Sequence, residues 1–428
     1  MSSATAHSEA DGTPPRWGGI ELRERQLEKL RAGIRGVLSS NPFWRRRLHD
    51  VTGWDDFERL PLTTKAELVA DQAAHPPFGT NLTHDLDRYV RLHQTSGSSG
   101  GQPLRWLDTE ESWTWCLRIW SEHVYRAAGV SAADRVFFAF SFGPFIGFWT
   151  AFGGAERLGA LAVSGGAMTT EQRVHSLIDL RSTVLLSTPT YALRLAEVAK
   201  GLGVDLAAAG VRVTIHAGEP GASIPATRAA IEAAYSAQCF DHTGMTELGP
   251  TGHSCSQRDG IHLVESEFIF EVIDAAGRPA ADGEDGELVA TNLGRWGSPL
   301  FRYRTGDRVS LSREQCSCGS PFLKLAGGIR GRVDDMFTVR GVNLYPSQVE
   351  DIVRRHPQVA EFVIEHRTIR QMDEVSLLVE IQGEDRSTDR LEADLRQALG
   401  VRLGCKVVPP GTLPRHELKS KRIVRVDG

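Results

Sequence analysis

The chain of 428 residues contains no run of apolar residues close to the roughly 20 that are needed to span a bilayer. It also lacks a basic excess, since its formal net charge is -5, and this argues against a nucleic-acid or membrane-surface binder. Its first nineteen residues have neither the basic start nor the apolar stretch of a secretory signal. We therefore expect a cytoplasmic protein with a disordered start (1–19), no nucleic-acid partner and no membrane partner.

Cysteine is also scarce, and the Gly-Lys dipeptide is absent. Six cysteines are too few for a disulfide scaffold in a chain of this length, so free thiols or metal ligands are the better expectation. The sequence has no Gly-Lys pair at all, which excludes a Walker-type phosphate loop. Hydrophobic residues, in contrast, make up 41% of the chain, enough for the cores of two or three domains.

A glycine- and hydroxyl-rich segment at residues 94–103 stands out from its surroundings. Its small residues would let backbone N–H groups approach phosphate oxygens, and its hydroxyls would add donors. A flexible linker explains the segment equally well when it is taken alone. The candidate phosphate-binding residues are Thr95, Ser96, Gly97, Ser98, Ser99 and Gly100.

From Arg135 onward, short apolar runs alternate with helical stretches, which predicts parallel, doubly wound α/β layers. In such sheets ligands bind beyond the carboxyl ends of the strands. Two turns are predicted at such ends, at residues 216–221 and 241–247. Each could be a plain glycine turn with a solvated carboxylate, but two at neighbouring strand ends favour a binding site.

The second half of the chain predicts a change of architecture. Consecutive short strands after Glu265 indicate a small antiparallel β unit, at about 250–325. The predicted fold is thus α/β, with a large N-terminal domain of doubly wound parallel α/β layers (20–331) that includes this unit. A hinge at 332–335 leads to a small, mobile α+β C-terminal domain at 336–428.

Five segments stand in the order found in the adenylate-forming (acyl-CoA synthetase) superfamily. They are residues 95–100, 244–247, 303–307 and 331–335, and a lysine near the C-terminus. The short N-terminal part, residues 340–350, and Leu413-Pro414-Arg415 before Lys419 resemble the phenylacetate-CoA ligase branch. The resemblance covers nearly the whole chain after residue 20, and the five motifs together are far more specific than any one.

This resemblance implies a two-step reaction. A carboxylate attacks the α-phosphate of ATP to give an acyl adenylate and pyrophosphate, and a thiol, usually that of CoA, then displaces AMP. No protein nucleophile is required, so catalysis comes from positioning and from neutralising charge on the phosphate. We expect a small, aromatic acid as substrate and CoA as acceptor; the branch also suggests a homodimer.

The resemblance also implies roles for individual residues. Thr246 would contact a phosphate oxygen and Glu247 would help to hold Mg²⁺. Lys419 would reach the α-phosphate and the substrate carboxylate, and leave when the small domain rotates about Asp334. The other nucleotide-binding residues would be Gly218, Glu219, Pro220, Asp241, His242, Thr243, Asp307 and Arg332. The acyl pocket would include Phe142, Phe145, His216, Ala217 and Gly244.

The chain departs from the family pattern at three places. Gln102 replaces the usual lysine of the phosphate loop, Thr243 stands where an aromatic residue stacks on adenine, and Gly221 replaces a frequent tryptophan. These departures keep a nitrite-activating diazotase or an amide ligase open as alternatives. A non-catalytic, zinc-stabilised nucleotide-binding protein is a further alternative. A scaffold would have no need for the set Glu247, Asp307, Arg332 and Lys419, which argues against that reading.

Four residues of the β unit predict a metal site. Cys255, His262 and the close pair Cys316 and Cys318 could supply the four N/S ligands of a tetrahedral zinc ion. A complete N/S shell leaves no position for a reactive water, so this zinc would be structural. His253 is a competing ligand, and four unlinked reduced side chains remain the alternative.

Overall fold

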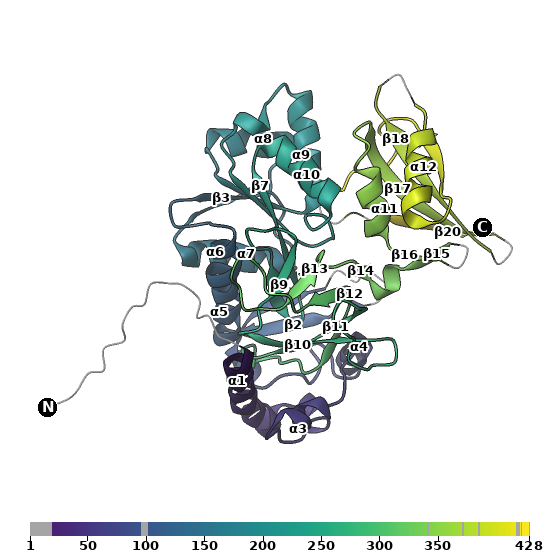
Figure 1. Ribbon diagram of the computed structural model, residues 1–428. Coiled ribbons are helices and arrows are strands. Elements are labelled where there is room, and N and C mark those ends of the chain that lie inside the picture. Colours follow the sequence, from purple (N-terminus) through teal and green to yellow (C-terminus); the bar gives the residue numbers. More distant parts are fainter. Residues whose placement is uncertain are drawn as a thin grey trace.

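The computed structural model describes residues 19–95, 102–339, 342–369, 372–383, 386–416, 420 and 422–427, which form a large and a small domain (Figure 1). The predicted disordered start up to residue 18, the predicted phosphate-binding residues 96–100 and Lys419 lie outside the described residues. Within the described part of the chain, helices long and apolar enough to cross a membrane are absent.

An amphipathic helix begins the described chain. In α1 (Gly19–Ser40) Leu22, Leu30, Ile34 and Val37 recur at helical spacing and are buried, and many of the positions between them are charged. The Gln26 side chain donates hydrogen bonds to the carbonyl oxygens of Glu265 and Phe268, at 2.9 and 2.8 Å, which ties α1 to the distant β unit. Three short helices follow: α2 (Pro42–Arg45), α3 (Trp54–Glu58) and α4 (Lys65–Ala74).

A hairpin and an interrupted helix come next. The hairpin pairs β1 (Tyr89–Gln94) with β2 (Arg105–Thr109), on either side of the predicted phosphate loop. The aromatic stretch predicted as one helix is α5 (Glu110–Ile119), a π-helical turn (Trp120–Val124) and α6 (Tyr125–Ala127). Single π-helical turns of this kind are frequent at functional sites.

The alternating region forms the predicted parallel layers. The strands lie in the order β4-β3-β5-β6-β7 and all neighbours are parallel. Apolar clusters fill both faces of this part of the sheet, as expected when helices cover both sides. The strands are β3 (Arg135–Phe138), β4 (Leu161–Ser164), β5 (Val184–Ser187), β6 (Val213–His216) and β7 (Gln238–Met245). The helices are α7 (Ile146–Leu158), α8 (Thr170–Asp179), α9 (Pro189–Gly201) and α10 (Pro225–Tyr235).

β7 joins the parallel layers to the antiparallel β unit. It is parallel to β6 and antiparallel to β8 (Gly249–His253), so strands β3 to β14 form one 12-stranded sheet. The prediction of a turn from Asp241 is wrong up to Met245, because pairing with β8 keeps the chain extended there. The other strands are β9 (Gly260–Leu263), β10 (Phe268–Ile273), β11 (Asp285–Asn292), β12 (Tyr303–Ser312), β13 (Lys324–Ala326) and β14 (Gly331–Arg332).

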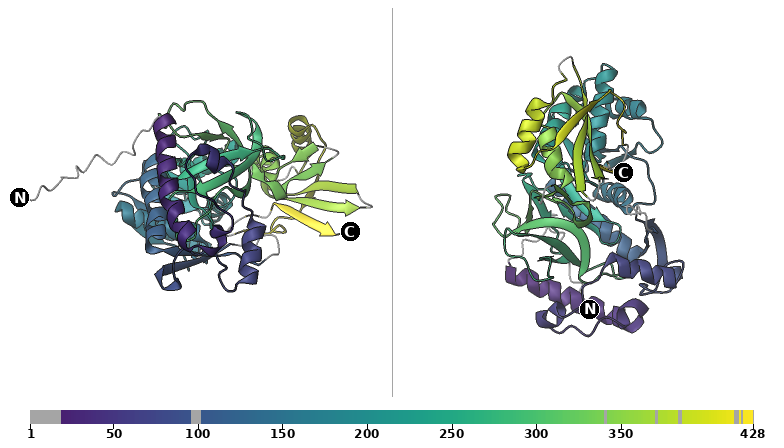
Figure 2. Two further views of the ribbon diagram at one scale, coloured as in Figure 1. Left: turned by 90° about the horizontal axis from the view of Figure 1, so that it is seen from below. Right: turned by 90° about the vertical axis from the view of Figure 1, so that its right-hand side faces the viewer.

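The small domain has its own sheet and core. Its main sheet has the order β19-β18-β17-β20, and an apolar cluster lies between this sheet and its two helices. The domain stands beside α10 of the large domain in Figures 1 and 2, and α10 contacts α11. Its elements are β15 (Phe337–Val339), β16 (Val342–Leu344), α11 (Pro346–Val353), β17 (Val359–Ile369), β18 (Met372–Ile381), α12 (Asp389–Leu399), β19 (Gly404–Val408) and β20 (Ile423–Asp427). The predicted fold class is confirmed.

Candidate active site

His216 and Asp241 lie side by side at the carboxyl edge of the parallel strands. His216 ends β6 and is paired in register with Ser187 of β5 and Asp241 of β7. Its ring is completely buried, with Nδ1 3.2 Å from the Ser187 hydroxyl, and burial lowers the pKa of His216 to about 4. Among the described residues its Nε2 has no hydrogen-bond partner. His216 is therefore neutral at pH 7, with one ring nitrogen unused.

Asp241 is a buried carboxyl group. The Ser223 hydroxyl and the backbone N–H of His242 donate to its two oxygens. Burial raises the pKa of Asp241 to about 6, although both hydrogen bonds oppose that rise. A group tuned in this way accepts hydrogen bonds at pH 7 and takes up a proton in mild acid.

His242 packs against the π-helical turn. Its ring centroid is 4.2 Å from that of Trp120, whose Nε1–H donates to the Thr150 hydroxyl at 3.0 Å. Nδ1 of His242 is 2.8 Å from the carbonyl oxygen of Gly252, so this nitrogen carries the proton and Nε2 is left as an acceptor. Burial lowers the pKa of His242 to about 3. The neighbouring Thr243 is also buried, and its carbonyl oxygen accepts from the Thr251 hydroxyl at 3.0 Å.

Glu247, the predicted magnesium ligand, is buried and meets two residues from distant parts of the chain. Lys65 Nζ at the start of α4 lies 3.2 Å from Glu247 Oε1, and the Tyr303 hydroxyl donates to the same oxygen at 3.3 Å. Sequence reasoning did not find Lys65, since nothing near it in the sequence marks it as part of a site.

A buried ion pair between Arg295 and Asp108 holds the backbone at Thr246. Arg295 and Asp108 are both completely buried and form two hydrogen bonds of 2.6 Å, and Arg295 Nη1 donates to the carbonyl oxygen of Thr246 at 2.7 Å. The bidentate geometry fixes the guanidinium plane, and with it the position of the Thr246 carbonyl. Sequence reasoning also missed this pair.

Asp307 and Arg332 face each other across β12 and β14. They are register partners, and Arg332 Nη1 lies 3.1 Å from Asp307 Oδ1 and 2.8 Å from the carbonyl oxygen of Thr305. Gly306, the residue before Asp307, has a φ of 74°, which favours glycine, and a Cβ there would meet the Arg332 guanidinium. The structure thus brings together two residues that the sequence predicts to contact the nucleotide.

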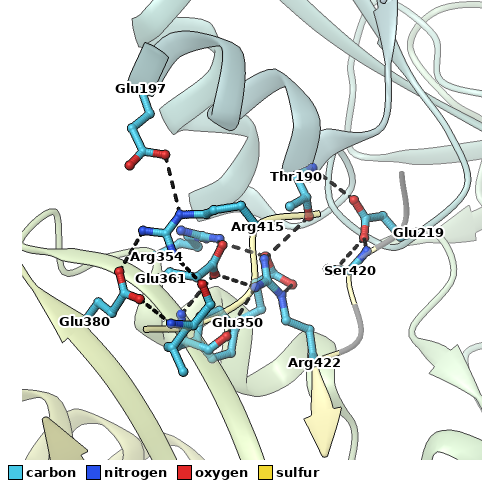
Figure 3. A network of polar contacts seen from close by, with 12 residues as sticks. Thr190, Glu197, Glu219, Glu350, Arg354, Glu361, Glu380, Arg415, Ser420 and Arg422 are labelled. Carbon is cyan, nitrogen blue, oxygen red and sulfur yellow. Dashed lines mark hydrogen bonds and ion pairs between the residues drawn. The ribbon is translucent and has the colours of Figure 1, made fainter. Parts of the chain in front are cut away.

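The Gly218-Glu219-Pro220 segment follows β6 and reaches the small domain. Gly218 has a φ of 99°, a conformation that suits glycine. The Glu219 carboxylate accepts from the Thr190 backbone N–H at 3.0 Å, and from the backbone N–H and hydroxyl of Ser420 at 2.7 and 2.6 Å (Figure 3). Ser420 immediately follows Lys419 in the chain.

The predicted pocket residues differ in their surroundings. His216 is buried, Phe142, Phe145 and Ala217 are partly buried, and Gly244 is exposed. Phe142 belongs to a cluster of rings, with centroid distances of 4.7 Å to Trp149 and 5.6 Å to Phe140. The loop before α7 is tied to the end of β1, because the Gln94 N–H donates to the Pro144 carbonyl oxygen at 2.8 Å. The aromatic cluster therefore lies close to Thr95, the described end of the predicted phosphate loop.

The four predicted zinc ligands converge. The ligand atoms of Cys255, His262, Cys316 and Cys318 all lie within 4.8 Å of one another. Cys255 Sγ is 3.7 Å from Cys316 Sγ, and Cys318 Sγ is 3.5 Å from His262 Nε2. Zn–S bonds of about 2.3 Å in a tetrahedron place sulfur atoms roughly 3.8 Å apart, so the distance between the sulfur atoms of Cys255 and Cys316 matches a zinc site.

The second ring nitrogen of His262 also suits metal binding. Its Nδ1 donates to the Phe322 carbonyl oxygen at 3.0 Å, which leaves Nε2 free of its proton and turned to the three thiols. His253, the competing ligand in the sequence, is buried with its ring centroid 6.3 Å from that of His262, outside the converging group.

The fold and this arrangement define an adenylate-forming enzyme. Residues 341–426 match the family model described as the AMP-binding enzyme C-terminal domain. The chain is 31% identical to the phenylacetate-coenzyme A ligase of Thermus thermophilus, over 93% of this chain and 94% of the relative. It is 30% identical to the enzyme of the same name from Aromatoleum evansii, over 94% of each chain. The chain belongs to the phenylacetate-CoA ligase family and is an AMP-forming acid–thiol ligase.

Solved structures identify the arrangement of the two domains. A 2-hydroxyisobutyryl-CoA ligase in the postadenylation state, in complex with 2-HIB-AMP, is similar with a TM-score of 0.92 and 27% identity, over 99% of this chain and 94% of that one. The same ligase in the thioesterification state gives a TM-score of 0.72, over 98% and 95%. The domain arrangement of the present structure is therefore more similar to that of the ligase in the postadenylation state than to that in the thioesterification state.

Proposed function

We propose that the acid activated by this enzyme is small and aromatic, and that the acyl group passes from its adenylate to CoA. The observation that supports an aromatic acid is the cluster of Phe140, Phe142 and Trp149 beside the described end of the phosphate loop. Aromatic faces and edges favour an aryl ring over an aliphatic chain of the same size. The neutral, buried His216 adds a polar group that does not repel a substrate carboxylate.

We assign the polar residues to the nucleotide. Asp307 would accept hydrogen bonds from the ribose hydroxyls, and Arg332 would hold the nucleotide and orient Asp307. Glu247 and Thr246 would stand at the phosphates, where Mg²⁺ supplies charge neutralisation when it is bound. Lys419 would add a mobile positive charge at the α-phosphate. None of these residues forms a covalent intermediate, so their work is positioning and electrostatic stabilisation.

We also propose that Cys255, His262, Cys316 and Cys318 hold a structural zinc ion. The four donors come from β9 and from loops of the β unit, so the metal would fasten segments that are more than fifty residues apart in the chain. The cytoplasmic location and the homodimer remain predictions. Light scattering on the purified protein would test whether it is a homodimer.

The experiment that tests the proposed function is pyrophosphate release from the purified protein with Mg²⁺ and ATP. A panel of aryl acids, aliphatic acids of matched size and nitrite would each be tried with and without CoA. Release that requires an aryl acid, with formation of its CoA thioester, is expected. Release driven by nitrite alone would indicate a diazotase, and aliphatic acids as the better substrates would overturn the aromatic assignment. No release under any condition would contradict the proposal.

A further inference from the structure

Glu219 connects the two domains through one carboxylate. Its Oε1 accepts from the Thr190 N–H of the large domain at 3.0 Å, and its Oε2 accepts from Ser420 N–H and Oγ–H of the small domain at 2.7 and 2.6 Å. Both oxygens are thus used, one on each side of the domain boundary (Figure 3). Hydrogen bonds to an ionised acceptor are stronger than neutral ones, so this contact holds the boundary closed.

Arg415, Ser420 and Arg422 contact neighbouring parts of the large domain, namely α9 and the loop after β6. Arg415 Nε lies 3.6 Å from Glu197 Oε2 on α9, and Arg422 Nη2 lies 3.5 Å from the Thr190 hydroxyl at the start of α9. The Ser420 contact lies between these two along the chain. Arg415, Ser420 and Arg422 therefore contact α9 or the loop after β6, and in the sequence they flank Lys419 on both sides.

Arg422 fixes the end of this segment, residues 415–422, to the small domain. It is buried and forms ion pairs with Glu350 at 3.0 Å and Glu361 at 2.6 Å, both within the small domain. A guanidinium held by two carboxylates cannot swing away with its loop, because breaking either pair would leave a buried charge unpaired. The segment is anchored to its own domain at Arg422 and to the large domain at Ser420.

We propose that Glu219 is the positioning residue that docks the lysine-bearing segment for adenylation. The inference rests on the proposed function, in which Lys419 acts at the α-phosphate. Ser420 is the next residue along the chain, so fixing its backbone N–H limits the space that the Lys419 side chain can reach. The contact belongs to the arrangement seen here, which resembles the postadenylation state and differs from the thioesterification state. Glu219 therefore serves the first half-reaction and not the second.

The test measures the two half-reactions separately. Adenylation would be followed by ATP–pyrophosphate exchange with the acid that supports it best, and thioester formation by adding CoA to the synthetic acyl adenylate at saturation. Glu219→Gln keeps the shape but offers one acceptor and one donor, so it cannot accept from both N–H groups. Ser420→Ala removes only the hydroxyl donor and keeps the backbone N–H contact with Glu219. Glu197→Gln, at the same boundary but at the Arg415 contact, is the matched control.

Glu219→Gln is expected to slow the exchange by roughly ten- to a hundred-fold, and Ser420→Ala by about three- to ten-fold, in proportion to the charge-assisted hydrogen bonds removed. Thioester formation should change by less than about three-fold in both. An equal loss of exchange in Glu197→Gln would show general loosening of the boundary and would overturn the specific role. A rise in KM for ATP in Glu219→Gln, with Ser420→Ala unchanged, would show a role in nucleotide binding alone and would overturn the proposal.

Amide hydrogen exchange gives a readout that needs no activity. The Ser420 and Thr190 N–H groups should be protected in the parent protein and should exchange faster in Glu219→Gln, while Glu197→Gln leaves them protected. Unchanged exchange at both amides would overturn the docking contact. A parent protein without any acid-dependent pyrophosphate exchange, but with this protection, would contradict the proposed function and leave the contact itself supported.

Discussion

Lys65 Nζ lies 3.2 Å from Glu247 Oε1, which joins the first residue of α4 to the predicted magnesium ligand. Glu247 is buried and Lys65 is exposed, so the lysine faces the solvent side of the site. The phosphate loop has Gln102 where the family has lysine. We propose that Lys65 supplies, at the phosphates of Mg-ATP, a positive charge that the predicted phosphate loop lacks.

From this relationship we predict that Lys65→Ala raises the KM for Mg-ATP by about ten-fold, with a smaller change in kcat, because a charge-assisted contact to a phosphate oxygen is lost. Initial rates of pyrophosphate release against Mg-ATP concentration measure both constants. Lys200→Ala, an exposed lysine in the last turn of α9, is the control and should match the parent. Unchanged constants in Lys65→Ala would mean that the pair with Glu247 does not contribute to the binding of Mg-ATP.

The buried pair of Arg295 and Asp108 leads to a prediction about stability. Arg295→Met leaves the Asp108 carboxylate buried without its partner, and should lower the free energy of unfolding by about 3–5 kcal/mol. Urea unfolding at neutral pH measures this loss. Arg278→Met breaks the exposed pair with Asp274 and should cost less than about 1 kcal/mol. Similar losses in the two variants would contradict the supporting role of Arg295.

The sequence predicts those parts of the fold and of the site that produce a recognisable pattern within a short stretch of residues. Alternating strands and helices predict the parallel layers, and the spacing of Cys316 and Cys318 predicts a ligand pair whose partners the structure brings within reach. Asp307 and Arg332 are found through motifs, and their pairing follows from two strands that lie side by side. In each of these cases the deciding residues are close in the sequence or belong to a motif.

The rest depends on contacts between distant segments. The end of β7 looks like a turn because Asp241 and Gly244 are poor strand formers, and only pairing with β8 makes it extended. Lys65 meets Glu247 across many intervening elements, and Glu219 meets Ser420 only when the two domains stand as they do here. No local pattern in the sequence predicts such contacts between distant residues.

The convergence of four N/S donors predicts one bound zinc ion per chain. Elemental analysis of the purified protein should find it, and Cys318→Ser should lose most of the metal and melt several degrees lower, because metal binding contributes to folding. Cys405→Ser, a thiol of the small domain outside the ligand group, is the control and should keep both metal and melting temperature. A metal-free parent protein with full stability would show that the four side chains are simply reduced and unlinked.

The two buried histidines at the strand ends predict a loss of stability in mild acid. Burial lowers the pKa of His216 to about 4 and that of His242 to about 3, whereas both titrate near 6.5 in the unfolded chain. Below pH 6.5 the unfolded chain thus binds protons that the folded chain does not. Their contribution to the free energy of unfolding is complete above about pH 6.5 and falls as the pH drops toward the folded pKa values.

Each of these histidines contributes a slope of about 1.4 kcal/mol per pH unit within that range. His242→Gln keeps a donor for the Gly252 carbonyl oxygen but cannot titrate, so its free energy of unfolding should fall less steeply between about pH 6 and pH 5, by the equivalent of one proton. Asp241, whose raised pKa acts in the opposite direction, is present in both proteins and cancels in the comparison. His49→Gln, on the exposed surface, should keep the parent slope. Parallel curves for the parent and His242→Gln would show that the folded and unfolded chains bind the same number of protons at His242 over this range, and would contradict the lowered pKa of His242.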